Sequence, residues 1–276
     1  MSRNWDLLIV LDACCYNIFK SVYDYILINT EIFQGKLLRA ISPGSETVEW
    51  LHKTFNNASS EFRDCVYISA NPYINSKIPV HGFDAKKVFY KVIDVWDFGW
   101  DYELGTVPPS WTTLAAQLAV KLYHDKRLII HYLQPHEPYI LLARLGIKPI
   151  PSFSKMNTLQ DQLRILQIIS RLMTYLRRRR LISKDIYYRF RWYLKLGLGN
   201  IHIDLALGRR ILLLAYLHNL LLALLSVKEL LKKMRDVYVI MTADHGELLG
   251  EYGMYGHRAG LHVRELIEVP WLEIVL

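Results

Sequence analysis

Residues 237–257, VYVIMTADHGELLGEYGMYGH, decide how the rest of the chain is interpreted. The stretch begins as an apolar run rich in β-branched and aromatic residues, which is typical of a buried strand. Asp244 and His245 follow where that strand ends, and His257 comes later from a glycine-rich loop. In an open α/β sheet, ligands bind at the carboxyl ends of the strands. These oxygen and nitrogen donors suit a divalent metal, although a capped strand with surface histidines would give the same pattern.

The composition indicates a folded protein with an anionic partner. The 276 residues are 52% hydrophobic and 22% charged, which is enough for one large α/β domain or two small ones. A net charge of +8 favours phosphate or sulfate esters, nucleic acid or an acidic membrane surface. Part of this charge lies in the four arginines at 177–180, but no recognisable nucleic-acid motif accompanies them.

The cysteines and the N-terminus bear on the cellular location. The 3 cysteines, two of them adjacent, cannot form a disulfide framework, which indicates a reducing compartment. The first apolar run is short and ends in Asp12, unlike the core of a signal peptide. We therefore expect a cytoplasmic protein, with membrane association as an alternative.

Apolar runs and turn signals alternate along much of the chain. They predict helices between strands, which is typical of a three-layer α/β sandwich with a mostly parallel central sheet. We expect residues 1–276 to form a single domain of this class. The strands are predicted at residues 7–11, 26–33, 65–70, 88–94, 127–133 and from 237 onward.

The alternation breaks in a leucine-rich, strongly basic segment, which we expect to be a helical insertion at about 149–210. A long helix at 209–234 then leads into the last predicted strand. Its apolar part, residues 211–227, includes Asn219 and is shorter than the ~20 residues that a membrane span needs. A buried helix is favoured. Peripheral attachment, with the arginine run meeting anionic headgroups, is the alternative.

Chemically useful side chains follow several predicted strands. Asp12 follows the first strand, and His136 follows the strand at 127–133. Because the carboxyl ends of parallel strands share one edge, both are expected near Asp244 and His245. Asp12, Asp244 and His245 form a plausible metal-ligand set.

Residues 42–47, SPGSET, precede a predicted helix and carry candidate nucleophiles. A hydroxyl at a helix N-terminus lies beside free backbone N–H groups and the positive end of the helix dipole. A nearby cation would lower the pKa of such a hydroxyl and activate it. A simple helix cap would explain the same residues.

Four motifs together resemble the alkaline phosphatase superfamily, in its sulfatase-like and phosphoethanolamine-transferase-like branch. They are Val-Leu-Asp-Ala-Cys, Ser-Pro-Gly-Ser-Glu-Thr, Gln-Pro-His-Glu-Pro-Tyr, and Thr-Ala-Asp-His-Gly-Glu followed by Gly-His. The resemblance implies an alkaline-phosphatase-like fold. It also implies a metal-dependent hydrolase or transferase that acts on a phosphate ester or phosphodiester through a covalent Ser/Thr phosphoryl-enzyme.

The resemblance also implies roles for individual residues. Asp12, Asp244 and His245 match the ligands of the metal that activates the nucleophile. Ser45 matches the nucleophile position best, and Thr47 is the second choice. We therefore expect one divalent ion, which could be Mn, Zn, Mg or Ca.

His136 and His257 match residues that contact the substrate or bind a second metal. Ile140 stands where two-metal members often have a histidine, so a second ion is less expected than substrate contacts from these histidines. The substrate is expected to be an anionic small molecule or a headgroup.

Two alternatives stay open. The first is a sulfuric ester hydrolase, although the SPGSET turn lacks the Cys/Ser-x-Pro-x-Arg pattern of formylglycine sulfatases. The second is a non-catalytic member of the fold that binds anions or a membrane.

Overall fold

The computed structural model describes residues 5–27, 29–146, 176, 179, 181 and 209–276. The insertion expected at about 149–210, with its arginine run, lies almost entirely outside the described residues. The prediction of one domain with such an insertion therefore stays a prediction.

The described residues form a seven-stranded, mostly parallel sheet in the order β2-β9-β6-β1-β5-β3-β4. β9 runs antiparallel to both neighbours, whereas the other pairs are parallel. This confirms the predicted fold class. The strands are β1 (Leu7–Leu11), β2 (Lys36–Ile41), β3 (Cys65–Ser69), β4 (Lys91–Asp94), β5 (Arg127–Tyr132), β6 (Tyr238–Thr242) and β9 (Glu268–Val275), and a separate hairpin pairs β7 (Leu248–Leu249) with β8 (Tyr255–Gly256).

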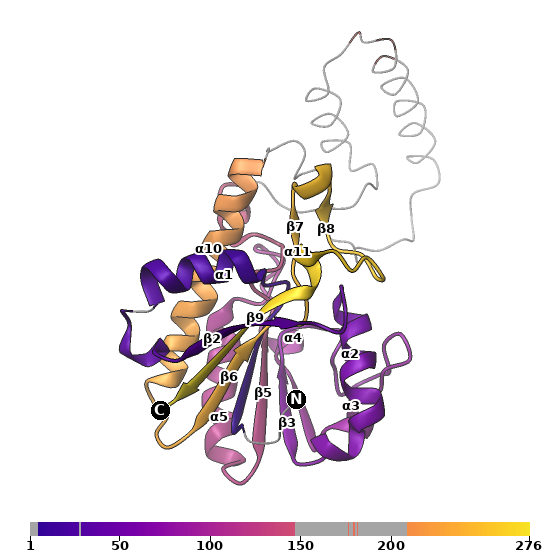
Figure 1. Cartoon of the computed structure of the whole chain (residues 1–276). Helices are drawn as coiled ribbons and strands as arrows, with labels where there is room; N and C mark the ends of the chain where they lie inside the picture. Colours follow the sequence, from indigo (N-terminus) through magenta and orange to yellow (C-terminus); the bar gives the residue numbers. More distant parts are fainter. Residues whose placement is uncertain (1–4, 28, 147–175, 177–178, 180, 182–208) are drawn as a thin grey trace.

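Helices cover both faces of the sheet. α1, α5 and α10 lie on one side, and α2 and α3 lie on the other (Figure 1). The helices are α1 (Tyr16–Val22), α2 (Thr47–Phe55), α3 (Ala85–Val88), α4 (Val95–Phe98), α5 (Pro109–Leu122), α6 (Ile140–Arg144), α10 (Arg209–Leu231) and α11 (Arg264–Ile267). Shorter helical turns are η1 (Tyr23–Leu27), η2 (Glu31–Phe33), η3 (Asn56–Phe62) and η4 (Glu251–Gly253).

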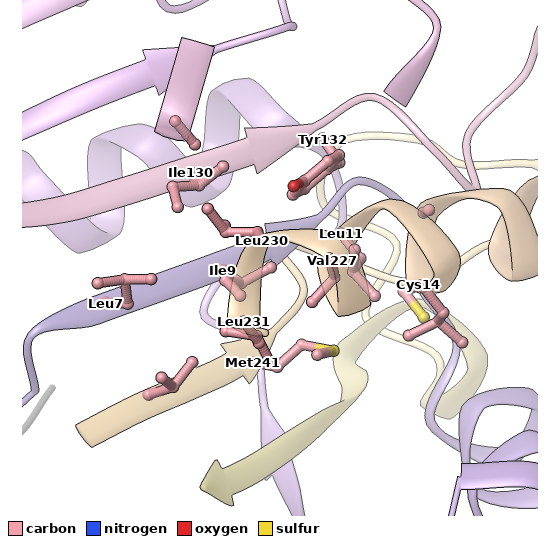
Figure 2. Packing of buried hydrophobic residues seen from close by; sticks show 14 of the residues in the cluster. Leu7, Ile9, Leu11, Cys14, Ile130, Tyr132, Val227, Leu230, Leu231 and Met241 are labelled. Atoms are coloured by element: carbon pink, nitrogen blue, oxygen red, sulfur yellow. The ribbon is translucent and has the colours of Figure 1, made fainter. Parts of the chain in front are cut away.

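The central strand β1 is buried along its whole length because both of its faces are covered. Ile9 and neighbouring odd-numbered residues join the core beneath α10, whereas Leu8 and Val10 join the core beneath α2. This alternation follows from the two-residue period of a strand. Figure 2 shows the first core, in which Ile9 lies near Leu230 and Leu231 of α10. The strand is apolar throughout, as expected for the middle of a parallel sheet.

α10 is a core helix in this structure. By length and composition alone, it is the one helix among the described residues that could cross a membrane. Its buried side chains nevertheless pack against the sheet, α5 and α6. The expected helix over residues 211–227 is present and packs on the sheet, while Ile211, Leu214 and Leu225 on its other side are exposed.

The strand at the β2 edge of the sheet is not the one that was predicted from the sequence. Residues 26–33 were predicted to be a strand, but η1 and η2 occupy most of this segment. The edge strand is β2 instead, and it pairs with β9. β2 has no strict alternation of buried and exposed residues, so the period that identifies a half-buried strand is missing there.

Candidate active site

Three adjacent strands deliver the candidate ligands to one edge of the sheet. β6, β1 and β5 are neighbours and run parallel, so their carboxyl ends lie side by side. Asp12 follows β1, Asp244 and His245 follow β6, and His136 lies in the loop after β5. The N-terminus of α2 brings Thr47 to the same edge. The structure therefore gathers residues that are far apart in the sequence.

Asp12, Asp244 and His245 form a buried cluster. One donor atom from each lies within 4.8 Å of the others. His245 Nε2 is 3.5 Å from Asp244 Oδ2 and 3.7 Å from Asp12 Oδ1. We call these three residues the ligand cluster.

The chemistry of the ligand cluster fits a divalent cation. Asp12 Oδ1 is buried and has no hydrogen-bond partner among the described residues. Two carboxylates and an imidazole are donors that Zn²⁺ and Mn²⁺ accept. A buried pair of carboxylates is costly unless positive charge compensates it. The residues present therefore fit a bound metal.

The charge state of the ligand cluster suits coordination. Burial would raise the pKa of Asp12, but the charges of His136 and His131 outweigh it and hold that pKa below its usual range. Burial lowers the pKa of His245, despite the opposing effect of Asp244. Asp12 is thus ionised and His245 is neutral near neutral pH, which are the forms that bind metals.

Thr47 is the hydroxyl residue that lies against the ligand cluster. It is the first residue of α2, and its side chain is buried. Its hydroxyl donates to Asp244 Oδ2 at 2.8 Å and lies 3.3 Å from His245 Nε2. An oxygen in this place is beside both the cluster and the positive end of the helix dipole.

Ser45 points elsewhere. Its hydroxyl lies 2.8 Å from both Glu49 Oε2 and the backbone oxygen of Arg258. A side chain on Gly44 would collide with the backbone of Trp50, since its Cβ would lie 2.3 Å from Trp50 N. The turn is thus folded tightly onto α2, and the second-choice nucleophile, Thr47, is the one that reaches the ligand cluster.

A second cluster lies beside the first. His136, Glu247 and His257 each offer a donor atom within 4.8 Å of the others. The ring centroids of His257 and His245 are 4.3 Å apart, so the two clusters adjoin. Glu247 was not singled out from the sequence, although it is the last residue of the Asp-His-Gly-Glu motif. That position was the available signal.

The second cluster pairs a protonated histidine with an ionised carboxylate. Burial would lower the pKa of His257, but Glu247, 3.1 Å away, raises it to about 9. Burial also opposes charging of His136, whose pKa is nevertheless raised by Asp12. His257 is therefore protonated at neutral pH. Such a cluster can bind an anionic group or, with its histidines neutral, a second cation.

Two further residues at the site were not predicted. His131 is buried in β5, and its Nε2 lies 3.6 Å from Asp12 Oδ2. Its Nδ1 is 2.8 Å from the Tyr67 hydroxyl. Asn71 follows β3 and donates to Asp12 Oδ2 at 2.7 Å. The Asn71 amide therefore holds Asp12 in place, whereas His131 lies near Asp12 without a hydrogen bond to it. The position of Asn71 after a strand was the signal that could have identified it.

A close backbone approach explains the glycine after His245. A Cβ on Gly246 would lie 2.0 Å from the backbone oxygen of Glu265. Gly246 N also donates to Leu266 O at 2.8 Å. The chain therefore turns away directly after the ligand cluster, and glycine is the residue that this contact admits.

Comparison with protein-family models and with curated proteins finds no match. Solved structures do match. The soluble domain of lipooligosaccharide phosphoethanolamine transferase A from Neisseria meningitidis has a TM-score of 0.57 at 13% identity, over 99% of this chain and 77% of that one. The integral membrane form of that transferase has a TM-score of 0.55 at 13% identity, over 100% of this chain and 48% of that one.

Two other proteins extend the comparison. The C-terminal periplasmic domain of EcEptC from Escherichia coli, in complex with zinc, has a TM-score of 0.50 at 12% identity, over 98% of this chain and 72% of that one. A putative sulfatase from Bacteroides thetaiotaomicron has a TM-score of 0.50 at 12% identity, over 100% of this chain and 65% of that one. The chain has the fold of these proteins. The resemblance to this branch of the alkaline phosphatase superfamily is thus confirmed for the fold.

The expectation of a cytoplasmic location is wrong. The similar structures are a periplasmic domain and an integral membrane protein with its soluble domain. The features that suggested the cytoplasm have structural explanations. The short apolar run before Asp12 is the core strand β1. The three cysteines, Cys14, Cys15 and Cys65, are buried free thiols. Their number therefore does not show whether the cellular compartment is reducing or oxidising.

Proposed function

We propose that this chain is a metal-dependent transferase or hydrolase of phosphate esters or diesters, with Thr47 as the nucleophile. The observation that carries the proposal is the position of the Thr47 hydroxyl. It lies 2.8 Å from Asp244 Oδ2 and 3.3 Å from His245 Nε2 at the start of α2. A hydroxyl beside buried metal-type ligands and a helix N-terminus is placed for attack on an anionic phosphorus centre.

Asp12, Asp244 and His245 would hold the metal ion. When bound there, a divalent cation supplies positive charge that lowers the pKa of a neighbouring hydroxyl and stabilises developing negative charge. The similarity to a domain in complex with zinc supports a divalent metal, and zinc is the ion to test first.

The chain's own residues suggest a two-step transfer. Thr47 Oγ1 forms a bond to phosphorus while the bond from phosphorus to the leaving oxygen breaks, and its hydroxyl proton passes toward Asp244 Oδ2. His257, protonated through its pairing with Glu247, binds the phosphoryl oxygens together with His136. The leaving oxygen takes up the proton that Thr47 released. Water or an acceptor alcohol then attacks the same phosphorus while the bond from Thr47 Oγ1 to phosphorus breaks, and the proton released by the attacking oxygen returns to Thr47.

A phosphoethanolamine-type headgroup is the proposed substrate, and the proposed location is periplasmic or membrane-linked. Both come from the names of the structures with the same fold, which include a lipooligosaccharide phosphoethanolamine transferase and a periplasmic domain. A phosphodiester headgroup also carries the negative charge that the second cluster would bind. The chain spans less than half of the intact integral membrane protein, so the acceptor is left to experiment.

Sulfuric ester hydrolysis is the second candidate, and the fold similarity to a putative sulfatase favours it. Thr47 is followed by Val48 and Glu49, whereas formylglycine sulfatases have a proline two residues after the modified residue. Phosphoryl transfer is therefore preferred.

Metal removal tests the proposal. Purified protein would be assayed on the nitrophenyl esters of phosphoethanolamine, phosphate and sulfate, before and after treatment with a chelator. We expect turnover of the phosphoethanolamine diester, its loss with the chelator and its return with Zn²⁺ or Mn²⁺. Turnover that ignores the chelator would refute a metal enzyme, and turnover of sulfate alone would establish the second candidate.

Ser45→Ala is expected to leave kcat/KM within about threefold of wild type, because this hydroxyl faces Glu49 and not the ligand cluster. The loss of its hydrogen bond is expected to cost about 1 kcal/mol of unfolding free energy. Steady-state kinetics and a urea melt would measure the two effects. Abolished turnover in a folded Ser45→Ala protein would return the nucleophile assignment to Ser45.

A further inference from the structure

α10 carries two fully buried polar side chains on an otherwise apolar face. Tyr216 and Asn219 are both 0% exposed, and they lie three residues apart, so they face the same side of the helix. A helix that only packed on the sheet would need neither polar group, because burying one is costly unless it is hydrogen-bonded. The hydrogen-bond partners of these two side chains therefore show which parts of the structure they hold.

Tyr216 holds the turn that follows Asp12. Its hydroxyl donates to Ala13 O at 2.7 Å and accepts from Cys15 N at 2.9 Å. Ala13 has a φ of 59°, a left-handed conformation that is uncommon for a residue other than glycine. Ala13 N also donates to Asp244 Oδ1 at 3.1 Å. The Tyr216 hydroxyl thus fixes the strained turn between Asp12 and α1. The backbone N–H of Ala13 in this turn then orients the Asp244 carboxylate.

Asn219 holds the loop that carries His136. Its Nδ2 donates to His136 O and Pro138 O, both at 3.1 Å, and its Oδ1 accepts from Ile140 N at 3.0 Å. These bonds use both ends of the amide group. A single side chain therefore links the backbone of His136 to the first residue of α6.

We propose that Tyr216 and Asn219 are positioning residues for the transfer reaction. Tyr216 sets the geometry of the ligand cluster, and Asn219 sets the place of His136 in the second cluster. Only the expected changes in kcat/KM rest on the proposed function, whereas the expected change in zinc affinity does not need turnover. In this proposal α10 is a core helix that also connects two loops of the site, namely the turn after Asp12 and the loop that carries His136.

The test separates the two roles by different measurements. Zinc affinity would be measured on metal-stripped protein by competition with a chelator, and KM and kcat on the phosphoethanolamine diester. Tyr216→Phe, which removes only the hydroxyl, is expected to weaken zinc binding at the ligand cluster by ~10- to 100-fold, with turnover recovering at high zinc. Asn219→Ala is expected to keep that zinc affinity within about threefold and to lower kcat/KM by ~10-fold or more, with no recovery at high zinc.

Leu230→Val is the matched control, because Leu230 is a buried core residue of α10 about 16 Å along the helix from Asn219. It is expected to lower the melting temperature without changing zinc affinity or kcat/KM. All measurements would be made below every melting transition, and Asn219→Ser would replace Asn219→Ala if the latter does not fold.

A wild-type zinc affinity in Tyr216→Phe would overturn the proposed role of Tyr216. An unchanged kcat/KM in the Asn219 variant would overturn the proposed role of Asn219. Changes that merely parallel the lost stability of Leu230→Val would overturn both. The zinc titration needs no turnover. It would therefore still decide the Tyr216 role if the protein did not turn over the phosphoethanolamine diester.

Discussion

Replacing Thr47 with alanine is expected to lower kcat/KM on a phosphodiester by ~10³-fold or more, in a protein that still folds and still binds zinc. The residue starts α2 with its hydroxyl 2.8 Å from Asp244 Oδ2, so its removal takes away the attacking oxygen. The lost hydrogen bond itself should cost only about 1 kcal/mol of unfolding free energy. The effect should therefore lie almost wholly in catalysis.

Two variants control this experiment. Thr47→Ser keeps a hydroxyl at the same place and should retain measurable turnover, whereas Ser45→Ala removes a hydroxyl two residues away. Steady-state kinetics and zinc titration of all three proteins would be compared. If Thr47→Ala kept kcat/KM within about tenfold of wild type, water or another side chain would be the nucleophile.

Asp244→Asn is expected to abolish both turnover and the stabilisation of the protein by zinc. Asp244 Oδ1 accepts from Ala13 N at 3.1 Å and from His245 N at 2.9 Å, and an asparagine oxygen can accept both bonds. The change therefore removes a negative charge and a metal ligand while it preserves the shape of the site. Metal affinity should fall because a neutral amide is a poor ligand for zinc.

Although Asp244→Asn should lose zinc binding, its unfolding free energy without metal should be equal to or higher than that of the metal-free wild type. Asp12 and Asp244 are buried side by side, so removing one carboxylate relieves their repulsion and the cost of burying a charge, which offsets the lost attraction to neighbouring histidines such as His257. Metal-free Asp244→Asn should melt at or above the temperature of the metal-free wild type. Zinc at ~100 to 1,000 times its dissociation constant should then stabilise only the wild type, by about 3–4 kcal/mol.

Thermal melts with and without zinc would measure this reversal. Equal zinc stabilisation in wild type and Asp244→Asn would show that the ion binds elsewhere, and the second cluster would be the next place to examine. A matched control is Asp94→Asn, because that carboxylate belongs to the last residue of β4 and accepts hydrogen bonds from Ser76 instead of lying at the ligand cluster. It should leave the zinc response unchanged.

The middle of the sheet could be predicted from the sequence because its strands are buried on both faces. β1, β5 and β6 are short, largely apolar runs, and a polar residue comes within two positions after the end of each. The edge could not be predicted in the same way. β2 has exposed residues on both faces and charges at Lys36 and Arg39, so only pairing with β9 defines it as a strand.

The site could be predicted as a set of strand ends, but not in its contacts. The rule that parallel strands end at one edge located Asp12, Asp244 and His245, and the structure brings them together, whereas their roles stay predictions. The choice between Ser45 and Thr47 depended on how one turn folds onto α2. Periodicity does not encode that geometry, because it arises from Glu49 accepting from both the backbone and the hydroxyl of Ser45.

The most direct test of the central claim is to find the phosphoryl group on the enzyme. Zinc-loaded protein would be mixed with a phosphodiester, quenched in acid within the first turnover, digested and examined by mass spectrometry. The account predicts that Thr47 carries the transferred phosphoryl-containing group and that this label is absent from Thr47→Ala. A label on Ser45, or turnover with no covalent label at any quench time, would contradict it.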